Sequence, residues 1–192
     1  MRRLQMKKRF TYVFGFSNKH GSLYSFFADY DDYPLETVAR RTRRVLNAGG
    51  LPYAAIVRSN RNRYHVYVPA LLKPGEVLRL HWFAKCDPYY AMFFLKHKRN
   101  VLRFSKKRAG EPAPALAREL FNARAKPCRL PAQFCELLEA MFGARPPKAN
   151  RYNAKVEASE YHMLPNGRKF YNRFLNASGL NARVAEVLAG CP

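Results

Sequence analysis

The sequence predicts an α+β protein with a mixed antiparallel sheet and flanking helices. Three observations carry this prediction. Hydrophobic residues make up 48% of the 192-residue chain and aromatic residues 14%, which is enough to build a core. Short aromatic and β-branched runs bounded by turn residues are typical of strands, and they occur at residues 10–16, 22–30, 53–58, 63–68 and 101–105. Segments of helical periodicity lie between them, which favours sheets covered by helices.

The first two strands, 10–16 and 22–30, are separated by a few turn residues, so we expect them to pair as a hairpin. Residues 32–50 predict a helix, with Pro34 suited to its first turn and the glycines at 49–50 ending it. Its polar face carries a run of arginines that is suited to nucleic-acid binding: Arg40, Arg41, Arg43 and Arg44.

The next two strands, 53–58 and 63–68, flank a polar turn that contains Arg61, and Pro69 is expected to end the second. Two helices follow at about 76–86 and 89–99, separated by Asp87 and Pro88, before the last strand.

Composition changes after about residue 110, where prolines interrupt the chain. We therefore expect a first domain at 1–110 and a mostly helical C-terminal extension at 111–192. Helices are predicted at 134–142, 172–176 and 182–188. This extension is expected to bind nucleic acid, with Lys169 as a candidate, or a partner protein.

The charge of the chain indicates its partner. Lysine and arginine number 35 against 13 acidic residues, a formal net charge of +22. Nucleic acid is the expected polyanion, because phosphate contacts release counterions. An anionic membrane is the rival, but we find no long basic amphipathic helix, no lipidation signal, and no apolar run near the roughly 20 residues of a spanning helix. We therefore expect no membrane partner and a cytoplasmic location.

The four cysteines form no CxxC pair and no zinc-finger spacing with histidine, which predicts free thiols.

Two carboxylates stand out in a chain so poor in acids. Asp29 and Asp31 end a predicted strand, where side chains alternate, so both point to the same side. Hard divalent ions take carboxylate oxygens, and Mg²⁺ typically uses one or two of them together with substrate phosphates. The alternative is that these residues and Asp32 form a solvated turn that caps the following helix.

Three further groups are weaker candidates on their own. His65 lies within a strand and shares a face with Arg63 and Tyr67, although a strand histidine is more often structural. Asp87 has the position of a helix cap. The strand that contains Arg103 leads into Lys106 and Lys107, which favours either a solvated edge or an anion site.

The order of these features resembles the archaeo-eukaryotic primase superfamily over about residues 10–108. The motifs that support the resemblance are FFADYD at Asp29 and Asp31, SNRNRYHVYV at Ser59 and His65, and the later Leu-Arg strand at Arg103. The resemblance implies an RRM-like primase palm. It also departs from the family, since Arg63 replaces a small residue, the turn before His65 lacks glycines, and Asp87 precedes a proline instead of ending a strand.

The resemblance also implies site roles. Asp29, Asp31 and Asp87 would hold Mg²⁺ or Mn²⁺, and His65 would contact the phosphates of the incoming nucleotide. Further nucleotide contacts would come from Ser59, Arg103, Lys106 and Lys107. Arg63 is a candidate for the same role because it shares a strand face with His65.

The implied activity is that of a primase or primase-polymerase, a nucleotidyltransferase that makes or extends primers from nucleoside triphosphates on a single-stranded DNA template. A helicase or other replication protein would be a further partner. The alternative is a non-catalytic nucleic-acid-binding protein with a primase-like or other basic α/β fold. A nicking replication initiator would need paired histidines, and the five histidines form no His-x-His pair.

Overall fold

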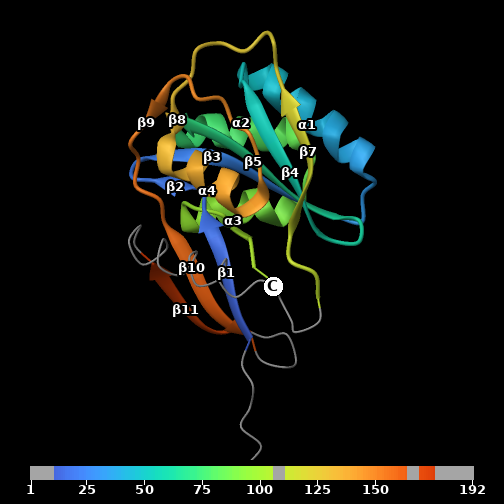
Figure 1. The fold of residues 1–192 in the computed structure, drawn as a ribbon, viewed down its shortest axis with the longest axis vertical. Coiled ribbons are helices and arrows are strands. Elements are labelled where there is room, and N and C mark those ends of the chain that lie inside the picture. The colour runs from blue at the N-terminus through green and yellow to red at the C-terminus, as the bar shows by residue number, and fades with distance from the viewer. Residues whose placement is uncertain (1–10, 106–110, 164–168, 176–192) are drawn as a thin grey trace, which may run out of the picture.

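A five-stranded antiparallel sheet forms the centre of the protein (Figure 1). The computed structural model describes residues 11–105, 111–163 and 169–175. The central sheet has the order β2-β3-β5-β4-β7, and its strands are β2 (Lys19–His20), β3 (Leu23–Asp31), β5 (Arg63–Leu72), β4 (Tyr53–Asn60) and β7 (Ala115–Phe121). A four-stranded sheet has the order β11-β10-β1-β6, and its strands are β11 (Lys169–Leu175), β10 (Ala158–Met163), β1 (Thr11–Ser17) and β6 (Val101–Arg103). The short strands β8 (Leu130–Pro131) and β9 (Arg151–Tyr152) pair in parallel.

The connection through α1 (Leu35–Gly49) organises the central sheet. Strands β3 and β4 each pair antiparallel with β5, so they run parallel to each other and β5 lies between them. The chain therefore crosses over one strand position through α1 and then returns through a hairpin, which is a split β-α-β arrangement. Helix α1 ends at Gly50, whose positive φ of 62° suits glycine and whose N–H bonds back to the last turn.

One face of the central sheet is covered by three helices: α1, α2 (Pro74–Ala84) and α3 (Pro88–His97). Alternate strand residues such as Phe26, Ile56 and Val66 point to this face and pack against Val38 and Leu80. Helix α1 buries its apolar side here and leaves its arginine-rich side toward solvent.

The opposite face is covered by strands of the second sheet and by α4 (Ala132–Phe142), which lies in front of the central sheet in Figure 1. Here Phe27 and Tyr67 pack with Phe16, Phe104 and Phe134 in a second buried cluster. The ring centroids of Phe16 and Phe104 lie 4.3 Å apart in a stacked arrangement. This second cluster covers only part of the face, which leaves the ends of β3 and β5 near Asp31 and Arg63 open to solvent.

The predicted hairpin between the first two strands is wrong. Strand β1 pairs with β6 and β10, whereas β3 pairs with β2 and β5. The side chain of Asn18 explains the change of sheet, because it bonds to the backbone of both Ser25 and Asn100 and so fixes a buried corner between the two sheets. Gly15 then allows the close approach of β6, since a Cβ there would lie 3.0 Å from the Leu102 carbonyl oxygen.

The predicted end of a strand at Pro69 is also wrong, because β5 continues to Leu72. The pairing of β3 with β5 changes register between Tyr24 and Phe26, opposite residues 68–72. Proline is tolerated at such an irregularity because the missing N–H interrupts no regular ladder there.

The prediction that residues 111–192 are mostly helical is wrong for the part that the structure describes. Only α4 is helical among the described residues after 110, and residues 172–175 belong to β11. Strand β7 pairs with β4, and β10 pairs with β1, so these segments extend the two sheets that the earlier residues form. Non-local pairing of this kind overrides the local propensity by which the helices were predicted. The helix predicted at 182–188 lies outside the described residues.

Helices α1 to α4 themselves agree with the predicted segments. Within the described residues, no helix has the length and apolar character needed to cross a membrane.

Candidate active site

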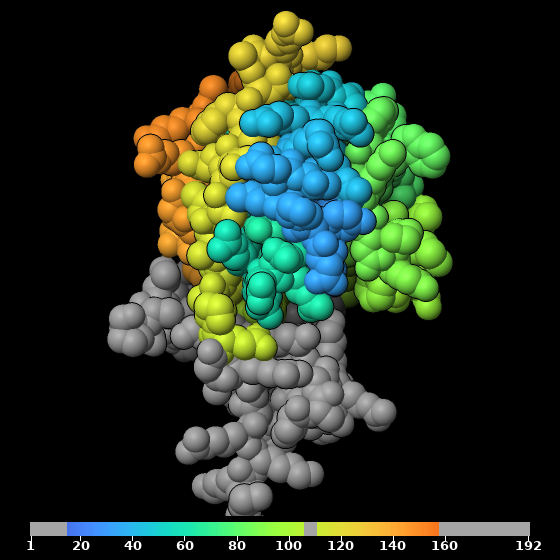
Figure 2. Space-filling model, turned by 90° about the vertical axis from the view of Figure 1, so that its right-hand side faces the viewer, coloured from blue at the N-terminus to red at the C-terminus, as the bar shows by residue number. Residues whose placement is uncertain are grey.

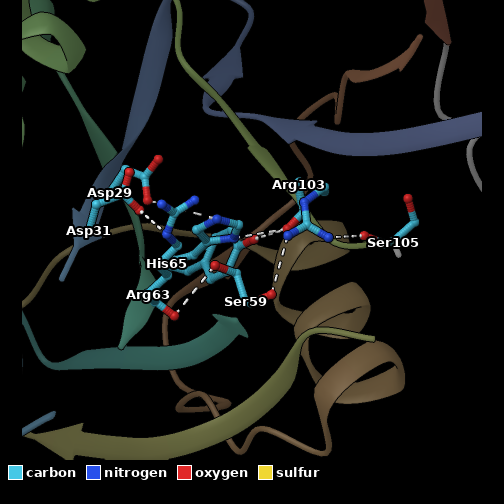
Figure 3. Close-up of polar contacts among 8 residues, drawn as sticks. Asp29, Asp31, Ser59, Arg63, His65, Arg103 and Ser105 are labelled. Carbon is cyan, nitrogen blue, oxygen red and sulfur yellow. Dashed lines mark hydrogen bonds and ion pairs between the residues drawn. The ribbon is translucent and has the colours of Figure 1, made fainter. Parts of the chain in front are cut away.

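The strongest candidate site lies where β3 and β5 extend beyond the second core cluster. The two strands pair so that Asp29 stands opposite His65 and Asp31 opposite Arg63. All four side chains therefore point to the same face of the sheet, as the sequence predicted for the two carboxylates. Figure 3 shows the carboxylates, Arg63 and the His65 ring gathered together, with Arg103 on the other side of the ring.

The position and tautomer of His65 are fixed by the backbone of β6. Its Nδ1 lies 2.9 Å from the carbonyl oxygen of Arg103, which can only accept, so Nδ1 carries the proton and donates it. Burial, and then the nearby Arg103 charge, lowers the pKa of His65 to about 3, so the ring is neutral near pH 7. In this tautomer Nε2 has a free lone pair, and it lies 3.8 Å from a carboxylate oxygen of Asp29.

Asp29 is the most perturbed acid of the site. Burial is the main cause that raises its pKa to about 7 from the ordinary 3.8, and repulsion from Asp31 and Asp87 raises it further. The charge of Arg63 acts in the opposite direction without cancelling these effects. A cation placed beside Asp29 would therefore be favoured, because it would relieve repulsion among the three carboxylates.

Asp31 is more exposed and has a partner of its own. Its carboxylate lies 3.4 Å from Nε of Arg63, and both side chains are about half exposed, at 55% and 46%. This ion pair is weak in water. Arg63 is therefore available to move from the carboxylate to a more highly charged anion.

Arg103 connects the strands beneath the pocket. Its guanidinium donates to the carbonyl oxygens of Ser105 at 2.6 Å and Ser59 at 3.2 Å. Ser59 is buried, and its hydroxyl lies 3.4 Å from the carbonyl oxygen of Arg63. Arg103 and Ser59 thus hold β4, β5 and β6 in place around His65 and supply positive charge to the site.

Asp87 lies beside this group but faces a different way. Its backbone N–H lies 3.4 Å from the carbonyl oxygen of Asp29, and its charge contributes to the raised pKa of that residue. Its carboxylate accepts from the N–H of Tyr89 at 2.9 Å and so caps α3, as the alternative interpretation expected. The structure therefore places Asp87 near Asp29, but the Asp87 side chain caps α3.

An open pocket of about 580 Å³ lies over these residues, which is within the range of small-molecule sites. Its lining is strongly polar and combines residues that the sequence proposed as nucleotide or metal contacts with others that it did not. The lining residues are Asp29, Asp31, Asp32, Ser59, Asn60, Arg61, Arg63, His65, Arg103 and Glu111. Asp32, Asn60 and Glu111 were not proposed as site residues; the first two follow predicted strands closely, and that position could have indicated them.

The edge of the pocket is formed by two turns that contact each other. The N–H of Tyr33, after β3, donates to the carbonyl oxygen of Asn62 in the β4–β5 turn at 3.2 Å. Asp32 and Asn62 both have positive φ values, 61° and 54°, which Asp and Asn tolerate better than most residues. This contact keeps the turn that carries Arg61 beside the carboxylates.

The donor set fits a hard divalent cation held by two protein carboxylates. Asp29 and Asp31 are adjacent on one face, and the pKa of Asp29 is raised chiefly by burial and further by repulsion from Asp31 and Asp87. Across the described residues, no group of three or more acidic, histidine or cysteine side chains is arranged to hold a metal. Mg²⁺ is commonly bound by one or two carboxylates together with substrate phosphates, so two ligands are sufficient for such a site.

The predicted nucleic-acid contacts differ in their surroundings. Arg40, Arg43 and Arg44 are exposed on α1, whereas Arg41 is half-buried. Arg41 donates to the carbonyl oxygen of Lys85 at 2.7 Å and lies 4.2 Å from the centre of the Tyr33 ring, so it also holds α1 against the α2–α3 junction.

Of the remaining candidates, Lys169 is the first residue of β11. Lys106 and Lys107 lie outside the described residues.

Comparison with known proteins adds no assignment. No protein-family model matches the chain, and no curated protein sequence matches it.

Proposed function

We propose that this protein is a primase-type nucleotidyltransferase that makes or extends primers on a single-stranded DNA template with Mg²⁺ or Mn²⁺. The observation that carries the proposal is the pairing of Asp29 with His65 and of Asp31 with Arg63 across two neighbouring strands, at the floor of an open polar pocket. The split β-α-β arrangement of the central sheet is compatible with an RRM-like palm.

The two carboxylates would hold the metal. When bound, divalent ions lower the pKa of an attacking hydroxyl and stabilise the negative charge on the leaving pyrophosphate. Asp29 must be ionised to act as a ligand, and its pKa of about 7 means that about half of it is protonated near neutral pH without the ion. Asp87, close to Asp29 in space, would add negative charge and would become a third ligand only by giving up its helix cap.

The basic side chains of the pocket would bind the triphosphate. Arg63 would exchange its exposed contact with Asp31 for phosphate oxygens, and Arg61 lies on the same rim. His65 presents a lone pair at Nε2, so it would donate to a phosphate only after taking up a proton, which a nearby triphosphate would favour. Arg103 would act chiefly by holding the His65 ring in place.

A non-catalytic nucleic-acid-binding protein is the second candidate. The capping role of Asp87 favours it, because that carboxylate is occupied within the protein. The two candidates differ in the role of Asp29 and Asp31. The first requires both carboxylates for synthesis, whereas in the second they contribute only negative charge.

The test is primer synthesis on single-stranded DNA with labelled nucleoside or deoxynucleoside triphosphates and Mg²⁺ or Mn²⁺. Asp29→Ala and Asp31→Ala should each abolish product while leaving DNA binding unchanged or tighter, because negative charge is removed. Glu36→Gln is the matched control, since it removes an exposed carboxylate on α1 that pairs with Arg118 away from the pocket. Full synthesis by both aspartate variants would refute the proposal, and salt-sensitive binding with no synthesis by the wild type would favour the second candidate.

A further inference from the structure

Helix α3 exposes its apolar side instead of burying it. Tyr89, Met92 and Phe93 are 73%, 59% and 57% exposed, and their spacing places them on one side of the helix. Within α3 only Phe94 is fully buried. A helix that packs on a sheet normally buries such a stripe, so this surface is available for a ligand.

Helix α2 extends this surface. Trp82 is 83% exposed, and together with Leu78, Ala91 and Leu95 it lines an apolar groove between α2 and α3. We call the exposed residues of both helices, with this groove, the α2–α3 surface. The rings of Tyr89 and Phe93 are therefore exposed on one side of α3, and the ring of Trp82 is exposed at the edge of the groove.

The charge on the α2–α3 surface is mostly positive. Five exposed lysine and arginine side chains lie on or next to its helices: Lys73, Arg79, Lys85, Lys96 and Lys98. On α3, Lys96 follows Phe93 and Met92 at helical spacing, so it lies on the same side of the helix as the exposed rings. The acidic residues of the two helices and their caps are Glu76, which caps the start of α2, and Asp87, which caps α3. Aromatic rings interleaved with cations are suited to a polyanion with unpaired bases.

The α2–α3 surface adjoins the candidate active site. The Tyr30 hydroxyl donates to the carbonyl oxygen of Ala84 at 2.7 Å, and the Asp87 N–H lies 3.4 Å from the carbonyl oxygen of Asp29. Arg41 joins the same junction to α1. Figure 2 shows the α2–α3 pair beside α1 on one face of the molecule, so a nucleic-acid strand on this surface would lie next to α1, whose exposed side carries Arg40, Arg43 and Arg44.

We infer that the α2–α3 surface binds single-stranded nucleic acid by stacking unpaired bases on Trp82, Tyr89 and Phe93, with Lys85 and Lys96 on the phosphates. This inference rests on the proposed function in one respect, namely that the bound nucleic-acid strand is the template for synthesis. A docking protein or a second copy of the chain would also bury apolar groups. Nucleic acid is favoured because the rings are accompanied by cations and the whole chain carries +22.

The chain contains a single tryptophan, so its fluorescence reports on this surface alone. Titration with a single-stranded oligonucleotide, without nucleotide or metal, should quench Trp82 emission, because a stacked base quenches indole. A blunt duplex of the same sequence should quench it much less, because its bases are already paired. Quenching by both forms alike, or by neither while the oligonucleotide still binds, would overturn the inference.

Substitutions separate stacking from general attraction. The double variant Tyr89→Ala/Phe93→Ala should weaken single-strand binding at least about 10-fold, since stacking contributes about 1–3 kcal/mol per base. Phe121→Ala is the matched control, because it removes an aromatic side chain that is 63% exposed on β7, away from α2 and α3, and its affinity should stay within about 2-fold. Lys85→Gln/Lys96→Gln should reduce the salt slope by about 0.7 for each phosphate that is no longer neutralised by a lysine.

Two results would overturn the inference in different ways. Equal loss of affinity in the Phe121 control and the double variant would show that the rings act without regard to position. Unchanged DNA affinity in the double variant, with a change in oligomeric state by sedimentation, would assign the surface to a second copy. Asp29→Ala should show the same Trp82 quenching as the wild type, so failure of synthesis and failure of this surface are separate outcomes.

Discussion

Asp29→Asn should make the folded protein more stable while it removes the proposed activity. The pKa of Asp29 is about 7 in the folded chain and ordinarily 3.8. Between these two pH values, the folded state therefore holds a proton that the unfolded state has lost. A difference of about 3 in pKa corresponds to about 4 kcal/mol. Because 36% of the side chain is exposed, water screens part of this, and we expect about 1–2 kcal/mol.

The sign of the effect sets the pH window. A raised carboxylate pKa favours the folded state at low pH, and that contribution is lost as pH rises from about 4 to 7. Urea unfolding should therefore show the variant more stable than the wild type by about 1–2 kcal/mol at pH 8, with a much smaller difference near pH 4. Added Mg²⁺ should stabilise the wild type and not the variant.

Asp32→Asn is the control for this experiment. It removes a neighbouring exposed carboxylate, and asparagine tolerates the positive φ at that position, so stability should change by less than about 0.5 kcal/mol. A variant at Asp29 that is less stable than the wild type at pH 8 would show that the carboxylate is not held at an electrostatic cost. The pocket would then have no unbalanced negative charge for a cation to relieve.

Two further predictions concern the fold around the site. Gly15→Ala should lower the free energy of unfolding by about 1–3 kcal/mol, because the added Cβ would meet β6 and move the strand whose carbonyl holds the histidine; thermal unfolding measures this, and an unchanged midpoint would contradict it. Burial lowers the pKa of three histidines, to about 4 for His20 and His81 and about 3 for His65, so each must take up a proton on unfolding in acid. In the Asp29→Asn background, stability should therefore fall as pH drops from 6.5 to 4, and a flat profile from pH-dependent urea titrations would refute this.

The local features of the site could be predicted from the sequence because they depend on strand alternation. Asp29 and Asp31 share a face, as do Arg63 and His65, whatever the strands pair with. That the two pairs face each other depends on the register of β3 with β5, which local sequence does not encode. The α1 crossover separates these strands in the chain, so their pairing is set by tertiary packing.

The sheet partners could not be predicted for the same reason. Strand β1 and the segment after residue 158 are far apart in sequence, and nothing in either one specifies the other. Helix propensity at residues 172–175 gives way to pairing with β10, and a hairpin expected from a short turn gives way to the buried corner at Asn18. Local propensity is a weak guide wherever long-range pairing satisfies the backbone.

The arrangement around His65 connects these long-range contacts to the proposed chemistry. Strand β6 contributes only three residues, yet the Arg103 carbonyl sets the tautomer of His65 and its guanidinium fixes the backbone at Ser59. The lone pair at Nε2 of His65 faces the Asp29 carboxylate, whose pKa is raised. Burial disfavours charge on both Asp29 and His65, so each is poised to gain from a charged ligand, a cation at the first and a phosphate at the second. Under the proposed function, a metal–triphosphate complex would bring both charges to this pocket at once, a cation to Asp29 and phosphates to His65.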